Sequence, residues 1–177
     1  MVVNSGQYCI YKKGNCTKGL TEGYVYWDDE AVKNINDKGG TLPDGIYDED
    51  TLIYYCCRTD GDKFTPMPLP LISPFYLKAY NSAECQRVEG AISTEEYILY
   101  DTEDKSNKDK RYGSYPYGAG ARNHRIFYCY YKSKFCNLEL KNRKHVPCSN
   151  ELWNRSTSVL KRCRSLIGYV THDLFKQ

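Results

Sequence analysis

Two stretches of this chain share one pattern, in which aromatic residues are followed by acidic residues. The first is residues 24–30, YVYWDDE, and the second is residues 97–103, YILYDTE, which lie 73 positions further on. A second pair of stretches, residues 53–57 (IYYCC) and 126–130 (IFYCY), has the same separation of 73. Because two independent matches share one separation, they indicate an internal repeat.

Each copy of the repeat has the pattern of β-strands. The aromatic stretches are about five residues long with turn residues on both sides, which is typical of strands rather than helices. A weaker match between residues 8–16 and 76–85 adds an upstream strand to each copy. We therefore predict a mostly-β, disulfide cross-linked domain, sandwich-like or barrel-like, with a pseudo-twofold repeat of about residues 7–65 and 75–132. The Pro-rich residues 66–74 are expected to form an extended connector.

Charge divides the chain into a mildly acidic body and a basic tail. Residues 133–177 hold nine Lys or Arg against three Asp or Glu, whereas the first 132 residues hold 16 against 19. The acidic body excludes the footprint of a nucleic-acid-binding domain. We interpret residues 7–132 as one β domain and residues 133–177 as a basic tail of unknown function. The tail is expected to present a solvated charged face, with contact to anions as the alternative, and apolar spacing from Ser149 onward predicts a short helix.

Nine cysteines in 177 residues predict disulfides, because the chain has no C-x-x-C pair and its histidines complete no zinc-binding pattern. Equivalent cysteines in the two copies are expected to form equivalent bridges. The two cysteines found only in the first copy, whose counterparts lie near Leu77 and at Tyr130, are expected to bond to each other. The expected bridges are Cys16–Cys56, Cys85–Cys129 and Cys9–Cys57, and they leave Cys136, Cys148 and Cys163 unassigned.

The cysteine content favours an extracellular or secreted protein. The N-terminal residues lack the apolar stretch of a signal peptide. No run of about 18 apolar residues is present, so we expect no transmembrane segment. We interpret the chain as a fragment, an incomplete gene model or a processed form, with a cytosolic protein as the alternative.

The order of several motifs resembles the C-terminal domain of apextrin, ApeC, over about residues 7–132. The motifs are residues 23–30 (GYVYWDDE), 42–45 (LPDG), 55–61 (YCCRTDG), 85–88 (CQRV), 101–104 (DTED) and 123–131 (NHRIFYCYY). In the first copy, Ala31 replaces the last Asp of the acidic motif. The resemblance implies an extracellular domain associated with apical matrix and innate immunity, similar in some relatives to lectins for bacterial cell-wall glycans.

The acidic cluster of Asp101, Glu103 and Asp104 has two interpretations. Clustered carboxylates suit Ca²⁺ or the hydroxyl groups of sugars, which makes Ca²⁺ the candidate cofactor, although the residues of an EF-hand loop are absent. Alternatively, these carboxylates cap loops and pair with Arg122 or Lys105. His124 lies directly before a predicted strand, and we expect it to have a structural role.

Residues 112–120, YGSYPYGAG, form an aromatic, Gly-rich stretch. Aromatic rings can cover the apolar C–H faces of sugars while neighbouring polar groups bind the hydroxyls. The alternative is that the stretch packs on its own domain. The full set of candidate ligand-binding residues is Asp101, Glu103, Asp104, Tyr112, Tyr115, Tyr117, Arg122 and Asn123.

No pattern in the sequence points to catalysis. Asp101 and Glu103 would share one face of a strand, as glycosidase carboxylates can. However, no nucleophile–base pair, phosphate-binding loop or metal motif accompanies them. We expect a non-catalytic module that binds bacterial cell-wall, peptidoglycan-type or other surface glycans in innate immunity. The alternatives are a matrix or adhesion protein with protein partners, and the targeting domain of a pore-forming protein.

Overall fold

The computed structural model describes residues 5–30, 32, 34–120, 122–136 and 146–147. The chain divides into two compact units, Met1–Lys132 and Ser133–Gln177. In the second unit, β9 (Phe135–Cys136) pairs antiparallel with β10 (Val146–Pro147). The helix predicted from Ser149 onward lies outside the described residues.

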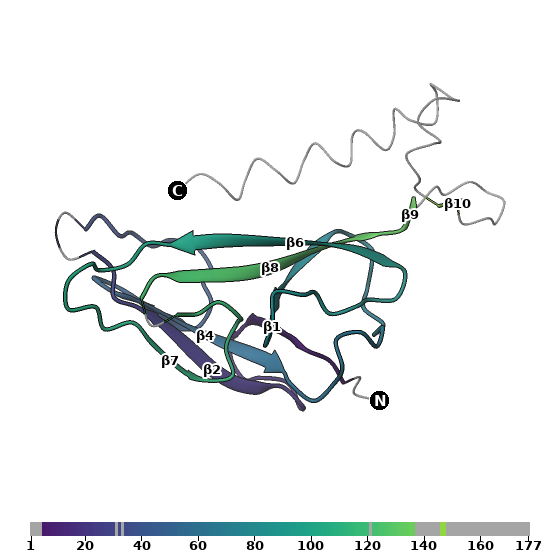
Figure 1. Ribbon diagram of the computed structural model, residues 1–177, viewed down its shortest axis with the longest axis horizontal. Coiled ribbons are helices and arrows are strands. Elements are labelled where there is room, and N and C mark those ends of the chain that lie inside the picture. Colours follow the sequence, from purple (N-terminus) through teal and green to yellow (C-terminus); the bar gives the residue numbers. More distant parts are fainter. Residues whose placement is uncertain (1–4, 31, 33, 121, 137–145, 148–177) are drawn as a thin grey trace, which may run out of the picture. The chain divides into compact units, whose positions relative to one another are not determined.

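The first unit is built from strands, with no helix in its described part (Figure 1). The strands are β1 (Tyr8–Tyr11), β2 (Thr21–Trp27), β3 (Gly45–Tyr47), β4 (Thr51–Arg58), β5 (Phe75–Ala79), β6 (Ala91–Tyr100), β7 (Lys110–Gly113) and β8 (His124–Ser133). They form one sheet in the order β6-β8-β5-β1-β4-β2-β7, and β3 pairs with β4 beside this path. The predicted mostly-β class is confirmed.

The predicted repeat is confirmed by the strand order. Strands β1, β4 and β2 lie in the order β1-β4-β2, and β5, β8 and β6 lie in the matching order β5-β8-β6. The two sets join where β1 pairs antiparallel with β5. Strands β4 and β8 begin at Thr51 and His124, which are 73 residues apart. The sheet therefore consists of two copies of one three-stranded unit.

One equivalence expected from the sequence is wrong by one residue. Tyr8 lies opposite Arg58, and Phe75 lies opposite Tyr131, the counterpart of Arg58. Tyr8 is therefore equivalent to Phe75 rather than Tyr76, and the counterpart of Cys9 is Tyr76. The error arises because the upstream match included length changes, which a sequence comparison alone does not place.

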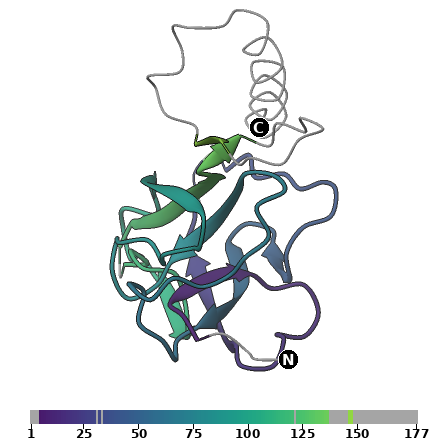
Figure 2. The ribbon, with the colours of Figure 1, turned by 90° about the vertical axis from the view of Figure 1, so that its right-hand side faces the viewer.

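The sheet bends into two layers, one that contains β6 and β8 and one that contains β2 and β4 (Figure 1). Figure 2 shows the same bend in a view turned by 90°. The edge strands β6 and β7 do not pair with each other in the described part of the chain, so no barrel closes. One apolar core packs between the two layers. Its fully or nearly buried members are Cys9, Val25, Trp27, Tyr55, Cys57, Ala119 and Ile126.

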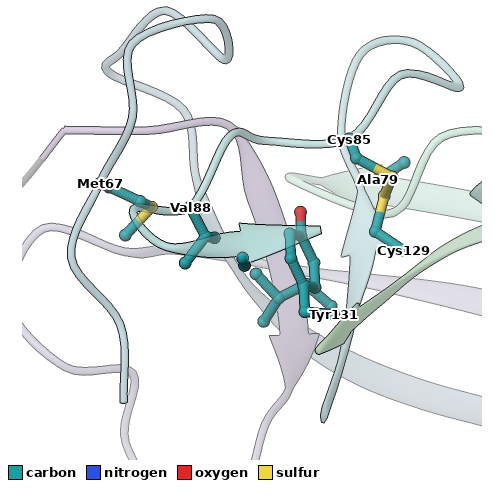
Figure 3. Close-up of a cluster of buried hydrophobic side chains, with 8 residues drawn as sticks. Met67, Ala79, Cys85, Val88, Cys129 and Tyr131 are labelled. Carbon is teal, nitrogen blue, oxygen red and sulfur yellow. A yellow bond between two sulfur atoms is a disulfide. The ribbon is translucent and has the colours of Figure 1, made fainter. Parts of the chain in front are cut away.

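A second core packs on the opposite face of the sheet, beneath the segments before and after β5. Met67 and Val88, from those segments, pack with Tyr131 and the Cys85–Cys129 bridge (Figure 3). Two cores form because neighbouring strand residues point to opposite faces, so that the aromatic strands bury side chains on both sides. The Pro-rich connector predicted from the sequence covers this second core through Met67.

All three predicted disulfides are present: Cys9–Cys57, Cys16–Cys56 and Cys85–Cys129. Cys9 and Cys57 lie directly opposite each other on β1 and β4. At the equivalent place in the second copy, Tyr76 lies opposite Tyr130, with ring centroids 5.0 Å apart. An aromatic pair thus occupies the place of a bridge in the second copy.

Candidate ligand-binding surface

The acidic motif at residues 101–104 surrounds a buried threonine. Thr102 is only 1% exposed. Its hydroxyl donates to the carboxylate of Asp109 (2.7 Å), and its backbone N–H donates to Oδ1 of Asn123 (2.9 Å). Asn107 donates to the same hydroxyl oxygen at 2.9 Å. The motif therefore fixes the loop after β6 through its one uncharged residue.

His124 extends this buried network. Its Nδ1 accepts a hydrogen bond from the N–H of Gly120, so the proton of the neutral ring lies on Nε2. Nε2 is 3.2 Å from the Asp109 carboxylate, and both side chains are fully buried. Burial lowers the pKa of His124, and Asp109 opposes that shift. These contacts give His124 the structural role expected from the sequence.

The first copy has the same network at equivalent positions. The N–H of Asp29, the counterpart of Thr102, donates to Asp50, the counterpart of Asn123. Asn36, the counterpart of Asp109, donates to Asp29 at 3.0 Å. An Asn34–Asn36 turn bond recurs between Asn107 and Asp109. The acidic motif is thus a loop-fixing element used twice.

The predicted carboxylate ligands lie around this network without converging. Asp101 is exposed, and Glu103 accepts a bond from the Lys105 N–H. Asp104 forms an exposed ion pair of 2.8 Å with Arg122. No group of three or more His, Cys, Asp or Glu side chains in the described part of the chain is arranged to hold a metal ion. Ca²⁺ remains a candidate cofactor suggested by the sequence.

The three predicted tyrosines of residues 112–120 point to three different places. Tyr115 packs against the core between the layers, and its hydroxyl accepts from Nε of Arg111. The ring of Tyr117 packs against Phe127, 5.4 Å away. Tyr112 lies on β7 and is 71% exposed. These rings therefore do not form one platform for a ligand.

Three tyrosines on neighbouring strands form a continuous row on the outer face of the sheet. Tyr112 on β7 stacks on Tyr24 of β2 with 5.9 Å between ring centroids, and Tyr24 meets Tyr54 of β4 edge-on at 5.8 Å. Tyr24 is directly opposite both partners in the strand register. We call Tyr112, Tyr24 and Tyr54 the tyrosine row.

Charged groups border the tyrosine row. Lys12 Nζ lies 5.1 Å from the centroid of the Tyr54 ring and pairs with Glu22 (3.1 Å) and Asp44 (3.7 Å). The hydrogen bond to Glu22 raises the pKa of Lys12. Nearby, Tyr26 donates to Asp50 at 2.5 Å, and this bond raises the pKa of Tyr26 to about 12. Aromatic faces are thus bordered by fixed donors and acceptors.

Lys12 also lines a pocket of about 480 Å³ beside the end of β1. The other residues that line it are Tyr11, Lys13, Thr41, Leu42, Pro43, Tyr47 and Ile53. Its size is within the range of small-ligand sites. Lys13 donates to the Leu42 carbonyl at 2.7 Å, which ties the pocket wall to β1. Lys12 therefore connects the tyrosine row to an apolar pocket.

Tyr24, Tyr54 and the pocket were not among the site residues predicted from the sequence. A signal for the two tyrosines was present, because each occupies the middle of an aromatic strand. The sequence did not reveal that β7 supplies their neighbour, Tyr112, which lies 88 positions after Tyr24.

The comparisons with known proteins agree with the motif pattern. The family model described as the C-terminal domain of apextrin, ApeC, matches residues 2–131. Searches of curated proteins and of solved structures gave no match. Within the described residues, the structure holds no helix long and apolar enough to cross a membrane. The disulfides and the family fit an extracellular protein, and the chain belongs to the apextrin C-terminal domain family.

Proposed function

We propose that this domain is a non-catalytic, secreted recognition module that binds surface glycans, with bacterial cell-wall glycans of the peptidoglycan type as the leading ligand class. The observation that carries the proposal is the tyrosine row. Three rings in cross-strand register offer a continuous aromatic surface for the C–H faces of sugar rings. The bordering charged groups can orient the hydroxyl and amide groups of such a ligand.

The rigid setting of the row supports the proposal. Tyr24 and Tyr54 lie on adjacent paired strands, and the Cys16–Cys56 bridge ties down the far end of β4. A preformed surface loses little conformational entropy when it binds. We assign the acidic motif of residues 101–104 a supporting role, because its buried contacts hold the loop that leads into β7.

The test is retention of the secreted, oxidised full-length protein on insoluble peptidoglycan, with calcium and with a chelator. Tyr24→Ala is expected to weaken binding by about tenfold, which corresponds to the loss of one stacked aromatic contact. Phe64→Ala removes an exposed ring that contacts Lys63 and Arg87 rather than the row, and it serves as the matched control. Tyr117→Ala removes a ring of residues 112–120 that is not part of the tyrosine row, so it tests whether that stretch binds the glycan instead.

Each outcome identifies a different site. Loss on Tyr24→Ala with retention on Phe64→Ala and Tyr117→Ala supports the row. Loss on conversion of Asp101, Glu103 and Asp104 to their amides, together with chelator sensitivity, would move the site to the acidic motif. A folded protein that ignores peptidoglycan, chitin and mucin under both conditions would refute glycan binding and favour the matrix-adhesion alternative.

A further inference from the structure

Strand β6 is the longest uncovered edge of the sheet. It is ten residues long and pairs with β8 on one side, and among the described residues no strand pairs with its other side. Eight of its ten residues are exposed, including Ile92, Tyr97, Ile98 and Leu99. Long, apolar edge strands carry unpaired backbone groups that readily accept another strand.

The repeat shows which part of β6 lacks a neighbour. Its counterpart β2 is covered by β7, which pairs with residues Gly23 to Tyr26. The equivalent residues of β6 are 96–99. Val25 is fully buried, whereas its counterpart Ile98 is 40% exposed. The exposed apolar residues of β6 thus lie where the first copy has an additional antiparallel strand.

The segment equivalent to β7 does not fill this position. That segment is residues 37–40, and no strand is formed there. Gly40 keeps the positive φ of its counterpart Gly113 (72° and 67°), so the turn is shared although the pairing is not. The chain therefore uses its second-copy strand β7 to cover the first copy and leaves β6 uncovered.

We propose that the outer edge of β6 pairs antiparallel with β6 of a second copy of this chain, about a twofold axis at Tyr97. A twofold axis perpendicular to a sheet places residues of the same face opposite each other. In this register Glu96 lies opposite Ile98 of the other copy, and Glu95 lies opposite Leu99. Each carboxylate then packs beside an apolar side chain, and the two Tyr97 rings meet at the axis.

Charge selects this register over its neighbours. An axis at Glu96 would place two copies of that carboxylate directly opposite each other. An axis at Ile98 would place Glu95 opposite Asp101. Like charges directly opposite in a ladder destabilise the pairing. Among these three registers, only the one centred on Tyr97 avoids such direct opposition.

The register is tested by crosslinking in the full-length, oxidised protein. Tyr97→Cys would place two thiols opposite each other with Cα atoms about 4.5–5.5 Å apart, within disulfide range. Leu99→Cys, on the same face and similarly exposed (54% against 57%), is the matched control. In the proposed register, the Leu99 positions of the two copies are offset by four residues along the strands, which separates them by about 13 Å. No disulfide spans that distance.

The expected result is a disulfide between two copies of tryptic peptide 88–105 for Tyr97→Cys only. This peptide has no native cysteine, so its dimer is unambiguous in mass spectrometry. Equal linkage at both positions, or none at Tyr97 in a protein with its three native bridges, would overturn the register. A monomeric mass for the unaltered protein in sedimentation equilibrium at every concentration would overturn the dimer itself.

A pair of lysine substitutions separates the dimer from glycan binding. Tyr97→Lys places two ammonium groups at the axis and is expected to weaken self-association by more than about tenfold. Tyr112→Lys, on the opposite edge of the sheet, is expected to leave the dimer intact while reducing retention on peptidoglycan. If Tyr97→Lys and the unaltered protein associate equally, the proposed edge is wrong whatever the glycan result.

Discussion

Lys78 carries a buried side chain surrounded by tyrosine rings. It is 5% exposed, and its Nζ lies 3.1 Å from the centroid of Tyr11 and within 6 Å of those of Tyr55 and Tyr128. No ion pair to Lys78 is present among the described residues. Burial lowers the pKa of Lys78 to about 7.

Lys78→Met is therefore expected to change how stability depends on pH. The unfolded chain binds a proton at Lys78 up to about pH 10.4, whereas the folded chain releases it near pH 7. Stability of the unaltered protein should then rise by roughly 2–3 kcal/mol from pH 7 to 9.5, and the variant should lose that rise. Urea unfolding at several pH values measures it, with the exposed Lys18→Met as control.

Within the acidic motif, the uncharged residue is expected to matter most for stability. Thr102→Val keeps the shape but leaves the buried Asp109 carboxylate and the half-buried Asn107 amide short of a hydrogen bond. The expected cost is about 1–3 kcal/mol. Asp104→Asn breaks only the exposed pair with Arg122 and should cost less than about 1 kcal/mol. Thermal unfolding of both variants measures the contrast, and equal losses would contradict it.

At the scale of the strands, two equivalent glycines pack closely against the backbones of β4 and β8. A Cβ on Gly118 would collide with the Arg125 carbonyl, and a Cβ on Gly45 would collide with the equivalent Leu52 carbonyl. Gly118 also has a φ of 91°. Gly118→Ala should therefore destabilise the domain by more than about 2 kcal/mol.

Gly39→Ala provides the control for this prediction. A Cβ there meets nothing within 4 Å, and its φ lies outside the left-handed region. Its effect should be near neutral or stabilising by up to about 1 kcal/mol. Chemical denaturation distinguishes the two variants, and a larger loss for Gly39→Ala would refute the packing explanation.

The sequence predicted those elements that the repeat specifies. Matches with one separation identified β2, β4, β6 and β8, and the counterparts of their cysteines identified all three bridges. The path of β7 could not be predicted from the repeat, because its counterpart at residues 37–40 forms no strand. Equivalent sequence positions specify local pairing, whereas a strand that crosses to the other copy is determined by tertiary packing.

The candidate site was predictable only in part for the same reason. Tyr112 was identified from composition, but its partners Tyr24 and Tyr54 were assigned only to strands. The acidic residues were noticed because charged clusters are conspicuous, whereas the function of Thr102 depends on burial. Burial of a single polar residue follows from the assembled loop, and the local sequence does not reveal it.

For the whole molecule, the stability of the oxidised domain is expected to depend on its disulfides. The three bridges close segments with sequence separations of 48, 40 and 44 residues. Each contributes on the order of 4 kcal/mol by restricting the unfolded chain, so together they match the entire stability of a typical domain. Reduction with excess dithiothreitol should therefore unfold residues 7–132, as read by loss of the near-UV circular dichroism of its tyrosines. A reduced protein that keeps this signal would contradict the prediction.

The positions of the bridges also limit how far the domain can be stretched. When the two ends of the domain are pulled apart, the force passes through the Cys9–Cys57 and Cys85–Cys129 bonds. The segments that these bridges enclose are therefore not stretched. Only the segment between Cys57 and Cys85, which holds 27 residues, can then lengthen appreciably. At about 3.5 Å per residue, that segment reaches roughly 100 Å when it is fully extended, and beyond this length covalent bonds bear the force. An oxidised chain anchored between two surfaces would act as a short tether of defined length.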